Sequence, residues 1–529
     1  MKSRTLLTLV FGLLLSSCGL EKKQSPSTDT VETVIAVEGG LISGLQNEEK
    51  SVAVFKGIPY AQPPLASLRW KPPQAVSPWE GIKDCTSFQA SPIQPNPAPF
   101  YMWSEEFLIP KKPISEDALY LNIWAPTQKS EKGSPVLVWI HGGGFSSGSG
   151  SVPIYDGEAL AKKGVVYVSI NYRLGLFGFL AHPELTQESE NHTSGNYGLM
   201  DQIAALKWIQ NNIEKFGGNP AQVTIAGQSA GGASVAFLVG SPQAKGLFSK
   251  AIIQSGAGFL PRTQHPGGLA LKELHHAEKE GKKFTDKLEI PSMEALRKIP
   301  ALTLLEKSSG RWQPIQDHYL LPQPLLQLFR EGKNNKVAVL TGWNQDDGIL
   351  IRGHQPRAAY ENTIRTNWKN AADTLLKFYP ATNDTIAKRS QGQLERDLTF
   401  GIQNYTLANL VSNQNEKVYM YRFTRDLPDG DQKDYGAFHT GEVPYALNTL
   451  QLVNRPFEPI DLQLEKTMAS YWVNFATTGN PNAEGLPEWP IYNPRSKEMM
   501  LLGEQVLAAP VNDSLALDFL VEKLTSPNP

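Results

Sequence analysis

A serine between two glycines lies near the middle of the chain, in the run Gly227-Gln228-Ser229-Ala230-Gly231. Strand-forming residues precede this run and small residues follow it, which is typical of a sharp turn from a strand into a helix. Glycines are needed where such a turn crowds its neighbours, and the strained backbone would expose the serine hydroxyl. Ser229 is therefore a candidate nucleophile. Because the short pattern also occurs by chance, a glycine-rich turn without chemistry is the alternative.

Candidate partners for this serine stand further along the chain. Asp346 and Asp347 follow the strand-like run Val337–Thr341, and His439 lies in a later stretch. A histidine can take the serine proton near neutral pH, and a carboxylate can orient the histidine. The chain order of serine, acid and histidine is that of α/β-hydrolases, and it differs from the orders in chymotrypsin and subtilisin.

A loop of bare backbone amides stands upstream of the serine. The apolar run Val136–Ile140 predicts a buried strand that leads directly into His141 and the glycines at 142–144. The N–H groups of such a loop can form an oxyanion hole. The loop, the serine, the acid and the histidine together favour nucleophilic catalysis through an oxyanion.

Several longer motifs recur in one order and span most of residues 34–500. They are Ser115–Trp124 (SEDALYLNIW), Asn171–Gly175 (NYRLG), Gly195–Gln202 (GNYGLMDQ) and Phe216–Pro220 (FGGNP), besides the serine, acid and histidine stretches. In these motifs the sequence resembles the type-B carboxylesterases, a family that includes cholinesterases and bacterial p-nitrobenzyl-type esterases. The resemblance implies an α/β-hydrolase fold, hydrolysis of carboxylic esters through an acyl-enzyme, and no metal or organic cofactor.

The resemblance assigns a role to each candidate residue. Ser229 is the nucleophile and His439 the general base, because the residues around His439 match the family's histidine block. The triad acid of the family is the second carboxylate of an acidic pair, commonly a glutamate, and Asp347 stands at that position. Asp346 is interpreted as a salt-bridging or capping residue. The expected oxyanion donors are the backbone N–H groups of Gly143, Gly144 and Ala230.

Departures from the family pattern bear on the chemistry. Asp347 is one methylene shorter than a glutamate, about 1.5 Å of reach, so the backbone must compensate. Gln228 stands where the family most often has a glutamate beside the serine. The amide removes a negative charge near His439, which weakens any preference for a cationic substrate and lowers the support for an imidazolium.

Cysteine usage excludes a disulfide framework. The chain has 2 cysteines, and if Cys18 carries lipid, Cys85 has no intramolecular partner. The family often closes a loop before its SEDCLYLN block with a disulfide, whose positions are Ala118 and a site near Ile93 here. The proline-rich stretch between them must be held by packing or be mobile. Cys85 is interpreted as a small buried apolar residue.

Strands and helices alternate around the candidate residues. In the run 201–213, Ile203, Leu206 and Ile209 fall near helical spacing and predict a helix with one buried face. Such alternation predicts a mostly parallel central sheet with helices on both faces. The stretch 33–58 predicts small antiparallel strands.

One catalytic domain is expected over residues 33–525, because the motifs run through the whole chain. Charged segments at about 261–311 and 358–410 are predicted to be helical insertions, which in the family cap the gorge of the active site. The first contains His265, His275 and His276. A zinc site is not expected there, because adjacent histidines point away from each other on a helix and no third ligand stands at metal spacing.

The N-terminus predicts export. A short basic segment and an apolar core too short to span a bilayer indicate a signal peptide over residues 1–17. The residues ending in Cys18 resemble the lipobox of bacterial lipoproteins, which predicts lipidation of Cys18, a polar tether over 18–32 and a place in the bacterial cell envelope, at the outer membrane or facing the periplasm. An ordinary secretory signal with an accidental cysteine is the alternative.

The charge balance and the aromatic residues limit the binding partners that are expected. With 50 Lys and Arg against 52 Asp and Glu, the chain shows no electrostatic preference for nucleic acid or anionic lipid, so the lipid anchor is the only membrane contact expected. Phe100, Tyr101 and Trp103 are interpreted as core or rim residues and not as a choline site. The predicted substrates are small esters with short to medium acyl chains. A lipase, an amidase and a non-catalytic binding module of the same fold are the alternatives.

Overall fold

The computed structural model describes residues 31–256, 258–260, 271–308, 310–348, 354–428 and 435–525. The predicted signal peptide, Cys18, His265 and nearly all of the predicted tether lie outside the described residues. Among the helices that are described, none is long and apolar enough to cross a membrane.

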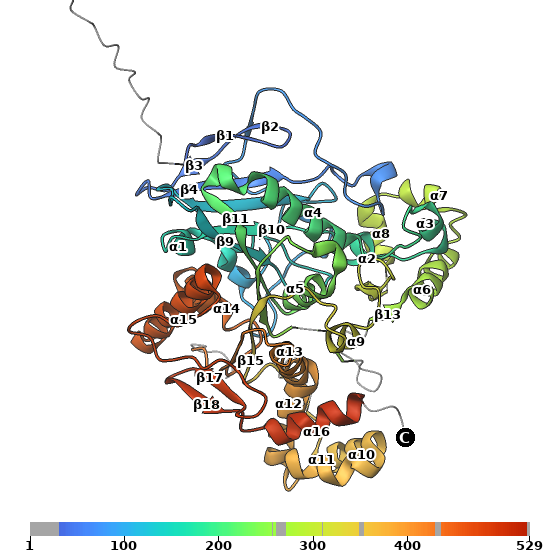
Figure 1. Cartoon of the computed structure of the whole chain (residues 1–529). Helices are drawn as coiled ribbons and strands as arrows, with labels where there is room; N and C mark the ends of the chain where they lie inside the picture. The colour runs from blue at the N-terminus through green and yellow to red at the C-terminus, as the bar shows by residue number, and fades with distance from the viewer. Residues whose placement is uncertain are drawn as a thin grey trace, which may run out of the picture.

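A large mixed sheet runs through the described part of the chain (Figure 1). Its strand order is β18-β17-β16-β15-β12-β11-β9-β10-β8-β4-β3. Neighbours from β10 to β17 are parallel, whereas β8, β4 and β3 at one edge and β18 at the other pair antiparallel. The sheet and its helices confirm the predicted α/β fold. In chain order the strands are β3 (Leu45–Gln46), β4 (Val52–Pro59), β8 (Tyr120–Pro126), β9 (Ser134–Ile140), β10 (Val166–Ile170), β11 (Gly218–Gln228), β12 (Lys250–Gln254), β15 (Ala338–Asn344), β16 (Val418–Phe423), β17 (Glu498–Leu502) and β18 (Val506–Pro510).

The N-terminal strands only partly form a separate sheet. β1 (Val34–Val37) and β2 (Gly40–Ser43) pair antiparallel, and β5 (Ile82–Asp84) lies parallel to β2. β4, in contrast, pairs with β8 and extends the central sheet. The prediction of antiparallel strands over 33–58 is therefore confirmed, although the last two of them, β3 and β4, belong to the main sheet and not to a small one.

The core lies on both faces of the central sheet. Every residue of β9 is buried, as expected for a strand covered on both sides. Alternate β9 residues enter different apolar clusters: Val138 packs with α4 (Tyr197–Asn212) and α5 (Ala230–Gly240), while Trp139 packs with α15 (Pro459–Thr478). The helix predicted over 201–213 is thus α4, and its buried side covers one face of the sheet.

The charged segments predicted as insertions are mostly helical where they are described. The first holds α6 (Leu274–Lys287), α7 (Met293–Arg297) and α8 (Ala301–Lys307), and the second holds α10 (Arg357–Trp368), α11 (Ala372–Phe378), α12 (Asp384–Arg396) and α13 (Ile402–Ser412). Figure 1 shows α10 and α11 beside the C-terminal α16 (Ser514–Thr525), away from α6 and α7. The remaining helices and short strands are β6 (Ser91–Pro92), β7 (Ile114–Ser115), α1 (Glu158–Ala161), α2 (Gly175–Phe179), α3 (Pro183–Glu188), β13 (Lys272–Glu273), β14 (Ile315–Gln316), α9 (Leu325–Arg330) and α14 (Val443–Leu447).

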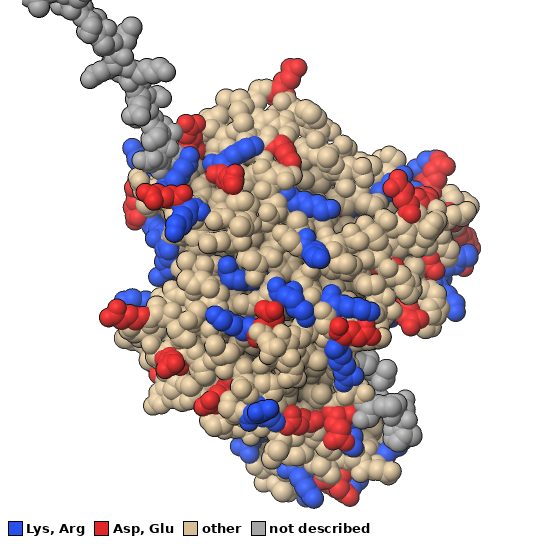
Figure 2. Space-filling view, viewed as in Figure 1, with Lys and Arg blue, Asp and Glu red and all other residues tan. Residues whose placement is uncertain are grey.

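Surface charges of both signs are mixed. Figure 2 shows acidic and basic side chains interspersed over the viewed face, without a large area of one sign. Such a surface offers no strong field for a polyanion on this face.

Candidate active site

The serine lies on the predicted turn. β11 ends at Gln228, α5 begins at Ala230, and Ser229 between them has φ 58° and ψ −123°. A positive φ is strained for a residue with a side chain. A Cβ on Gly231 would overlap the carbonyl oxygen of Ile140, and one on Gly227 would lie 2.5 Å from the carbonyl carbon of Gly231. Only glycines fit on both sides of the serine, as the sequence predicted.

Asp347 and His439 are brought together at the ends of β15 and β16. Asp347 is fully buried, and its Oδ1 lies 2.9 Å from Nδ1 of His439. Its Oδ2 accepts hydrogen bonds from the Ser255 hydroxyl at 2.8 Å and from the Asn344 backbone N–H at 2.7 Å. The carboxylate is therefore fixed, and it holds the proton of the imidazole on Nδ1. Nε2 is left as the nitrogen that can act as a base.

The neighbouring Asp346 has a different partner. Its Oδ2 accepts a hydrogen bond from the backbone N–H of Ala437 at 3.0 Å. Burial raises the pKa of Asp346 to about 6. This bond ties the acid loop to the stretch before His439, which agrees with the interpretation of Asp346 as a capping residue.

The glycine loop after β9 has a backbone that only glycine adopts freely. Gly143 and Gly144 have φ of 105° and 62°, and a Cβ on Gly143 would overlap the backbone of Ser147. His141 at the start of the loop is fully buried and stacks on Tyr172, with ring centroids 4.4 Å apart. Burial lowers the pKa of His141 to about 4, so the ring is neutral and structural.

The proline-rich stretch without a disulfide is held by hydrogen bonds and packing. β6 pairs with β7, and Ile93 is buried. The side chain of Gln94 donates to the carbonyl of Gly148 and accepts from its N–H, both at 2.8 Å. Cys85 is fully buried, as predicted. Gln94 thereby links this stretch to the segment that follows the glycine loop.

Ser229, His439 and the glycine loop open into one pocket of about 610 Å³. Phe100 and Trp103 contact each other in its lining, with ring centroids 4.6 Å apart and planes tilted by 50°, and Phe100 is 51% exposed. The described residues that line the pocket include no Asp, Glu, Lys or Arg. They are Gln94–Ala98, Phe100, Trp103, Phe107–Ile109, Gly142–Gly144, Ser146–Gly148, Val152, Tyr155, Gln228, Ser229, His439 and Thr440.

The helices of the two insertions contribute nothing to that list. The expectation that they cap the pocket is therefore not met by their described residues. Phe400, however, lies in the second insertion and stacks on His439, with ring centroids 4.5 Å apart and planes 19° from parallel. The second insertion thus reaches the site through one ring.

Gln228 contacts the histidine as well. Its carboxamide nitrogen lies 3.3 Å from Nδ1 and 3.2 Å from Nε2 of His439. A nitrogen almost equidistant from both ring nitrogens cannot lie in the direction of either lone pair. Gln228 therefore contacts the imidazole without occupying the lone pair of Nε2.

Glu442 is a second buried acid near Asp347 and His439, and sequence reasoning gave it no role. It is fully buried and accepts hydrogen bonds from the side chains of Gln254 at 3.1 Å and Asn344 at 2.6 Å. Burial raises the pKa of Glu442 to about 7, and the nearby charge of Asp347 acts in the same direction. Only the position of Glu442 three residues after His439 could have signalled it.

The side chains of two adjacent surface histidines lie differently from the prediction. His275 and His276 were expected to point apart, but their ring centroids are 3.8 Å apart, and Nδ1 of His275 lies 3.3 Å from Oε2 of Glu273. The prediction was wrong because both rings are exposed in the first turn of α6, where they can lean to the same side. Their ligand atoms and that of Glu273 lie within 4.8 Å of one another. None of these residues lines the Ser229 pocket.

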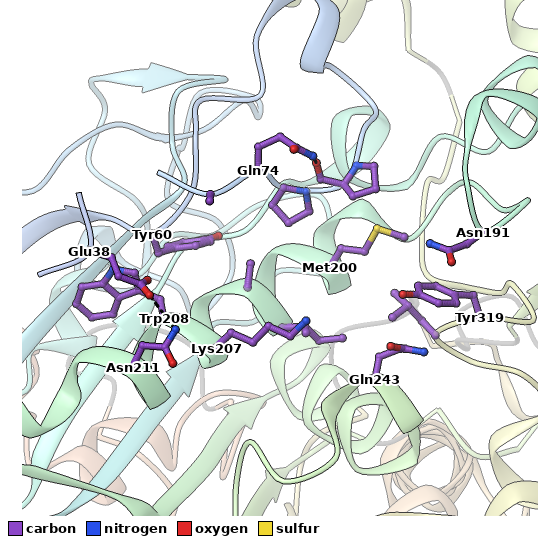
Figure 3. Close-up of a pocket in the computed structure, with 16 residues that line it drawn as sticks. Glu38, Tyr60, Gln74, Asn191, Met200, Lys207, Trp208, Asn211, Gln243 and Tyr319 are labelled. Carbon is purple, nitrogen blue, oxygen red and sulfur yellow. Dashed lines mark hydrogen bonds between the residues drawn. The ribbon is translucent and has the colours of Figure 1, made fainter. Parts of the chain in front are cut away.

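A second cavity of about 370 Å³ lies along α4. Its lining residues include Met200, Lys207 and Trp208 of this helix together with Gln74 and Tyr319 from other segments (Figure 3). Its described lining residues include neither Ser229 nor His439, and none is shared with the first pocket. The pocket that holds Ser229 and His439 is therefore the candidate active site.

Comparisons with known proteins agree with this geometry. A family model described as "Carboxylesterase family" matches residues 31–515. The chain is 35% identical over 505 residues to a fumonisin B1 esterase of Sphingopyxis macrogoltabida, covering 90% of this chain and 88% of that protein. It is 36% identical over 488 residues to a para-nitrobenzyl esterase of Bacillus subtilis (89% and 95% covered) and 35% identical over 537 residues to a liver carboxylesterase of Sus scrofa (92% and 92%).

Proposed function

This chain belongs to the carboxylesterase family and hydrolyses carboxylic esters, and on that premise we propose that Ser229, His439 and Asp347 are its catalytic triad. The observation that carries the proposal is the bond between Asp347 and Nδ1 of His439, beside a serine in a strained turn. A shorter acid than the usual glutamate still reaches the imidazole, because the loop after β15 brings its backbone close.

The reaction follows from the positions of these groups. The hydroxyl oxygen of Ser229 attacks the ester carbonyl and passes its proton to Nε2 of His439. The backbone N–H groups of Gly143, Gly144 and Ala230 stabilise the oxyanion. The intermediate then expels the alcohol, which takes the proton from His439, and leaves an acyl group on Ser229. Water, deprotonated by His439, releases the acid and restores the serine.

Neutral esters with short to medium acyl chains are the substrates that the pocket supports. Its described lining has apolar walls from Phe107, Ile109 and Val152 and no Asp, Glu, Lys or Arg. A neutral Gln228 beside the serine also removes a charge that would favour a cation. Esters of neutral, bulky alcohols fit this chemistry better than choline esters or long triglycerides.

Covalent labelling tests the nucleophile. An organophosphonate should modify Ser229 stoichiometrically, and Ser229→Ala should abolish turnover of p-nitrophenyl acetate, whereas Ser234→Ala, a change one helical turn further along α5, should leave labelling of Ser229 intact. Modification of a different serine, or an active Ser229→Ala variant, would contradict the assignment.

A series of p-nitrophenyl esters tests the substrate range. Each methylene bound by the pocket contributes about 0.8 kcal/mol, so kcat/KM should rise until the pocket is filled and then fall. We expect the maximum between about two and six acyl carbons. A continued rise to long chains with activation at an oil–water interface would favour a lipase. A strong preference for amides of the same acids would favour an amidase.

We further propose that the protein is anchored by lipid at Cys18 in the bacterial cell envelope. The support is the lipobox-like sequence that ends in Cys18 and the polar stretch after it. The wild type should partition into detergent, and its mature N-terminus should be an acylated Cys18, whereas Cys18→Ser should be uncleaved or soluble. A mature N-terminus at another residue without acyl chains would show an ordinary secretory signal.

A further inference from the structure

The ring of Phe400 lies against the imidazole of His439 from a distant part of the chain. The two rings are nearly parallel, at 19°, with centroids 4.5 Å apart. Phe400 is half-buried and is not among the described residues that line the Ser229 pocket. Its contact is therefore with the candidate base and not with the pocket in which substrate binds.

A π turn places this ring. Residues Asp397–Gly401 form one π turn between α12 and α13. Such a turn adds a residue to the helical repeat and shifts the side chains that follow, and it is common at functional sites. Here a ring within the turn contacts His439, which comes after β16 in the chain.

Buried charges fix the N-terminal end of the π turn. The Arg396 guanidinium donates to the Asp397 carboxylate at 2.7 and 3.0 Å and to Asp513 at 2.7 Å. It also donates to the backbone carbonyl of Gln345, two residues before Asp347, at 3.4 Å. Arg396 and Asp397 are 3% and 0% exposed, so these bonds are shielded from water. The same network therefore holds both the π turn and the acid loop.

Asn404 fixes the C-terminal end of the turn. Its side-chain amide donates to the carbonyls of Phe400 at 2.8 Å and Gly256 at 2.9 Å, and its oxygen accepts from the Thr341 hydroxyl at 2.8 Å. Gly256 follows Ser255, which donates to Asp347. Phe400 is thus tied to the strands that carry the triad acid and cannot shift independently of them.

We propose that Phe400 is a positioning residue for His439 in ester hydrolysis. A flat ring parallel to the imidazole prevents the imidazole from turning about its Cβ–Cγ bond. The face of an aromatic ring also attracts a cation, so it stabilises the imidazolium that forms when His439 takes the proton from Ser229. The side chain of Gln228 beside Ser229 is uncharged and gives the imidazolium no counter-charge, whereas the face of Phe400 gives it a neutral support. The inference rests on the proposed role of His439.

Two charged residues near His439 must be considered when the effects of Phe400 variants are interpreted. Asp347, from the loop after β15, bonds to Nδ1, and Glu442, at the start of α14, interacts electrostatically with the ring. Both remain in a Phe400 variant, so a change in the titration of the base reports the loss of the ring and not the loss of a charge.

The test compares Phe400→Leu and Phe400→Tyr with Phe378→Leu in the full-length protein. Phe378 is a matched control, because it is a half-buried phenylalanine of the same insertion and pairs with Phe519 at 5.7 Å, away from His439. With p-nitrophenyl acetate, Phe400→Leu should lower kcat about tenfold with KM changed less than about twofold, and should lower the acidic pKa of the kcat/KM profile by about half a unit. Phe400→Tyr should restore both quantities.

The other outcomes overturn the inference. If Phe400→Leu loses only thermal stability, as Phe378→Leu should, or if the tyrosine variant is as impaired as the leucine variant, Phe400 is ordinary packing. A separate variant, His439→Gln, distinguishes this failure from failure of the proposed triad. Loss of activity there with a fully active Phe400→Leu refutes only the role of Phe400, whereas an active His439→Gln refutes the triad itself.

Discussion

The two halves of the candidate site are built in different ways. The serine turn and the glycine loop owe their shape to glycines within a few residues, such as Gly143 and Gly231, whose positions leave no room for a Cβ. The acid and the histidine are held by residues from many parts of the chain, including Ser255 and Phe400. Local backbone geometry thus shapes the first half, and long-range packing shapes the second.

The sharpest test of the long-range half is a change at its acid. Asp347→Asn should lower kcat by about 10⁴, because the amide favours the wrong tautomer of His439 while leaving the fold intact. Asp346→Asn is the matched control, since Asp346 bonds to a backbone N–H and not to the imidazole. It should act mainly on thermal stability. If the two effects were reversed, the triad acid would be Asp346.

In the locally shaped half of the site, His141 should make the free energy of unfolding depend on pH. Its pKa is about 4 when folded and about 6.5 when unfolded, so the unfolded state takes up the proton first as the pH falls. The neutral buried ring therefore contributes stability above pH 6.5 that is lost toward pH 4. Between pH 7 and pH 5 this loss should be about 2 kcal/mol in the free energy of unfolding.

Urea unfolding of the wild type and of His141→Asn measures that contribution. The pKa values of Asp346 and Glu442 are raised, so their contributions to the free energy of unfolding decrease as the pH rises through the same window. Both residues are present in both proteins, so these contributions cancel when the two proteins are compared. The wild type should be the more stable at pH 7, and the difference in the free energy of unfolding between the two proteins should be smaller by about 2 kcal/mol at pH 5. A difference that is constant with pH would mean that His141 is solvated or already charged.

A methyl group tests the glycine requirement directly. Gly231→Ala should destabilise the protein by about 1–3 kcal/mol and lower kcat, because the new Cβ would overlap the Ile140 carbonyl and push the glycine loop away from Ser229. Gly392→Ala in α12 is the control, since a Cβ there meets nothing within 4 Å. Replacing such an unobstructed helical glycine by alanine should raise the free energy of unfolding by about 0.4–1 kcal/mol. Measurements of thermal unfolding and kcat for both variants test whether position 231 requires glycine.

The same division explains how far the sequence could be interpreted. The Gly-x-Ser-x-Gly turn, the glycine loop and the strands that lead into them were predicted, because their physical requirements lie in consecutive residues. Ser255, Glu442 and Phe400 were missed, since each acts only after strands distant in sequence have come together. His275 and His276 were misjudged for a related reason: a helical rule fixes backbone directions but not the rotamers of exposed rings.

The smallest predicted effect lies where the two halves meet, at Ser255. This residue follows β12, its backbone N–H donates to the carbonyl of Gly342, and its hydroxyl donates to Oδ2 of Asp347 at 2.8 Å. Ser255→Ala removes one of the hydrogen bonds that fix the carboxylate but leaves the bond from the Asn344 N–H. A hydrogen bond to a charged group contributes about 1.5–3 kcal/mol, and the remaining bond compensates in part, so kcat should fall about tenfold with little change in KM. Ser255→Thr, which keeps the hydroxyl, should retain more activity than the alanine variant if its methyl group is accommodated, and urea unfolding of both variants shows whether it is. An alanine variant that is fully active and fully stable would mean that the backbone of the acid loop alone positions Asp347, and the acid would then belong with the locally shaped half of the site.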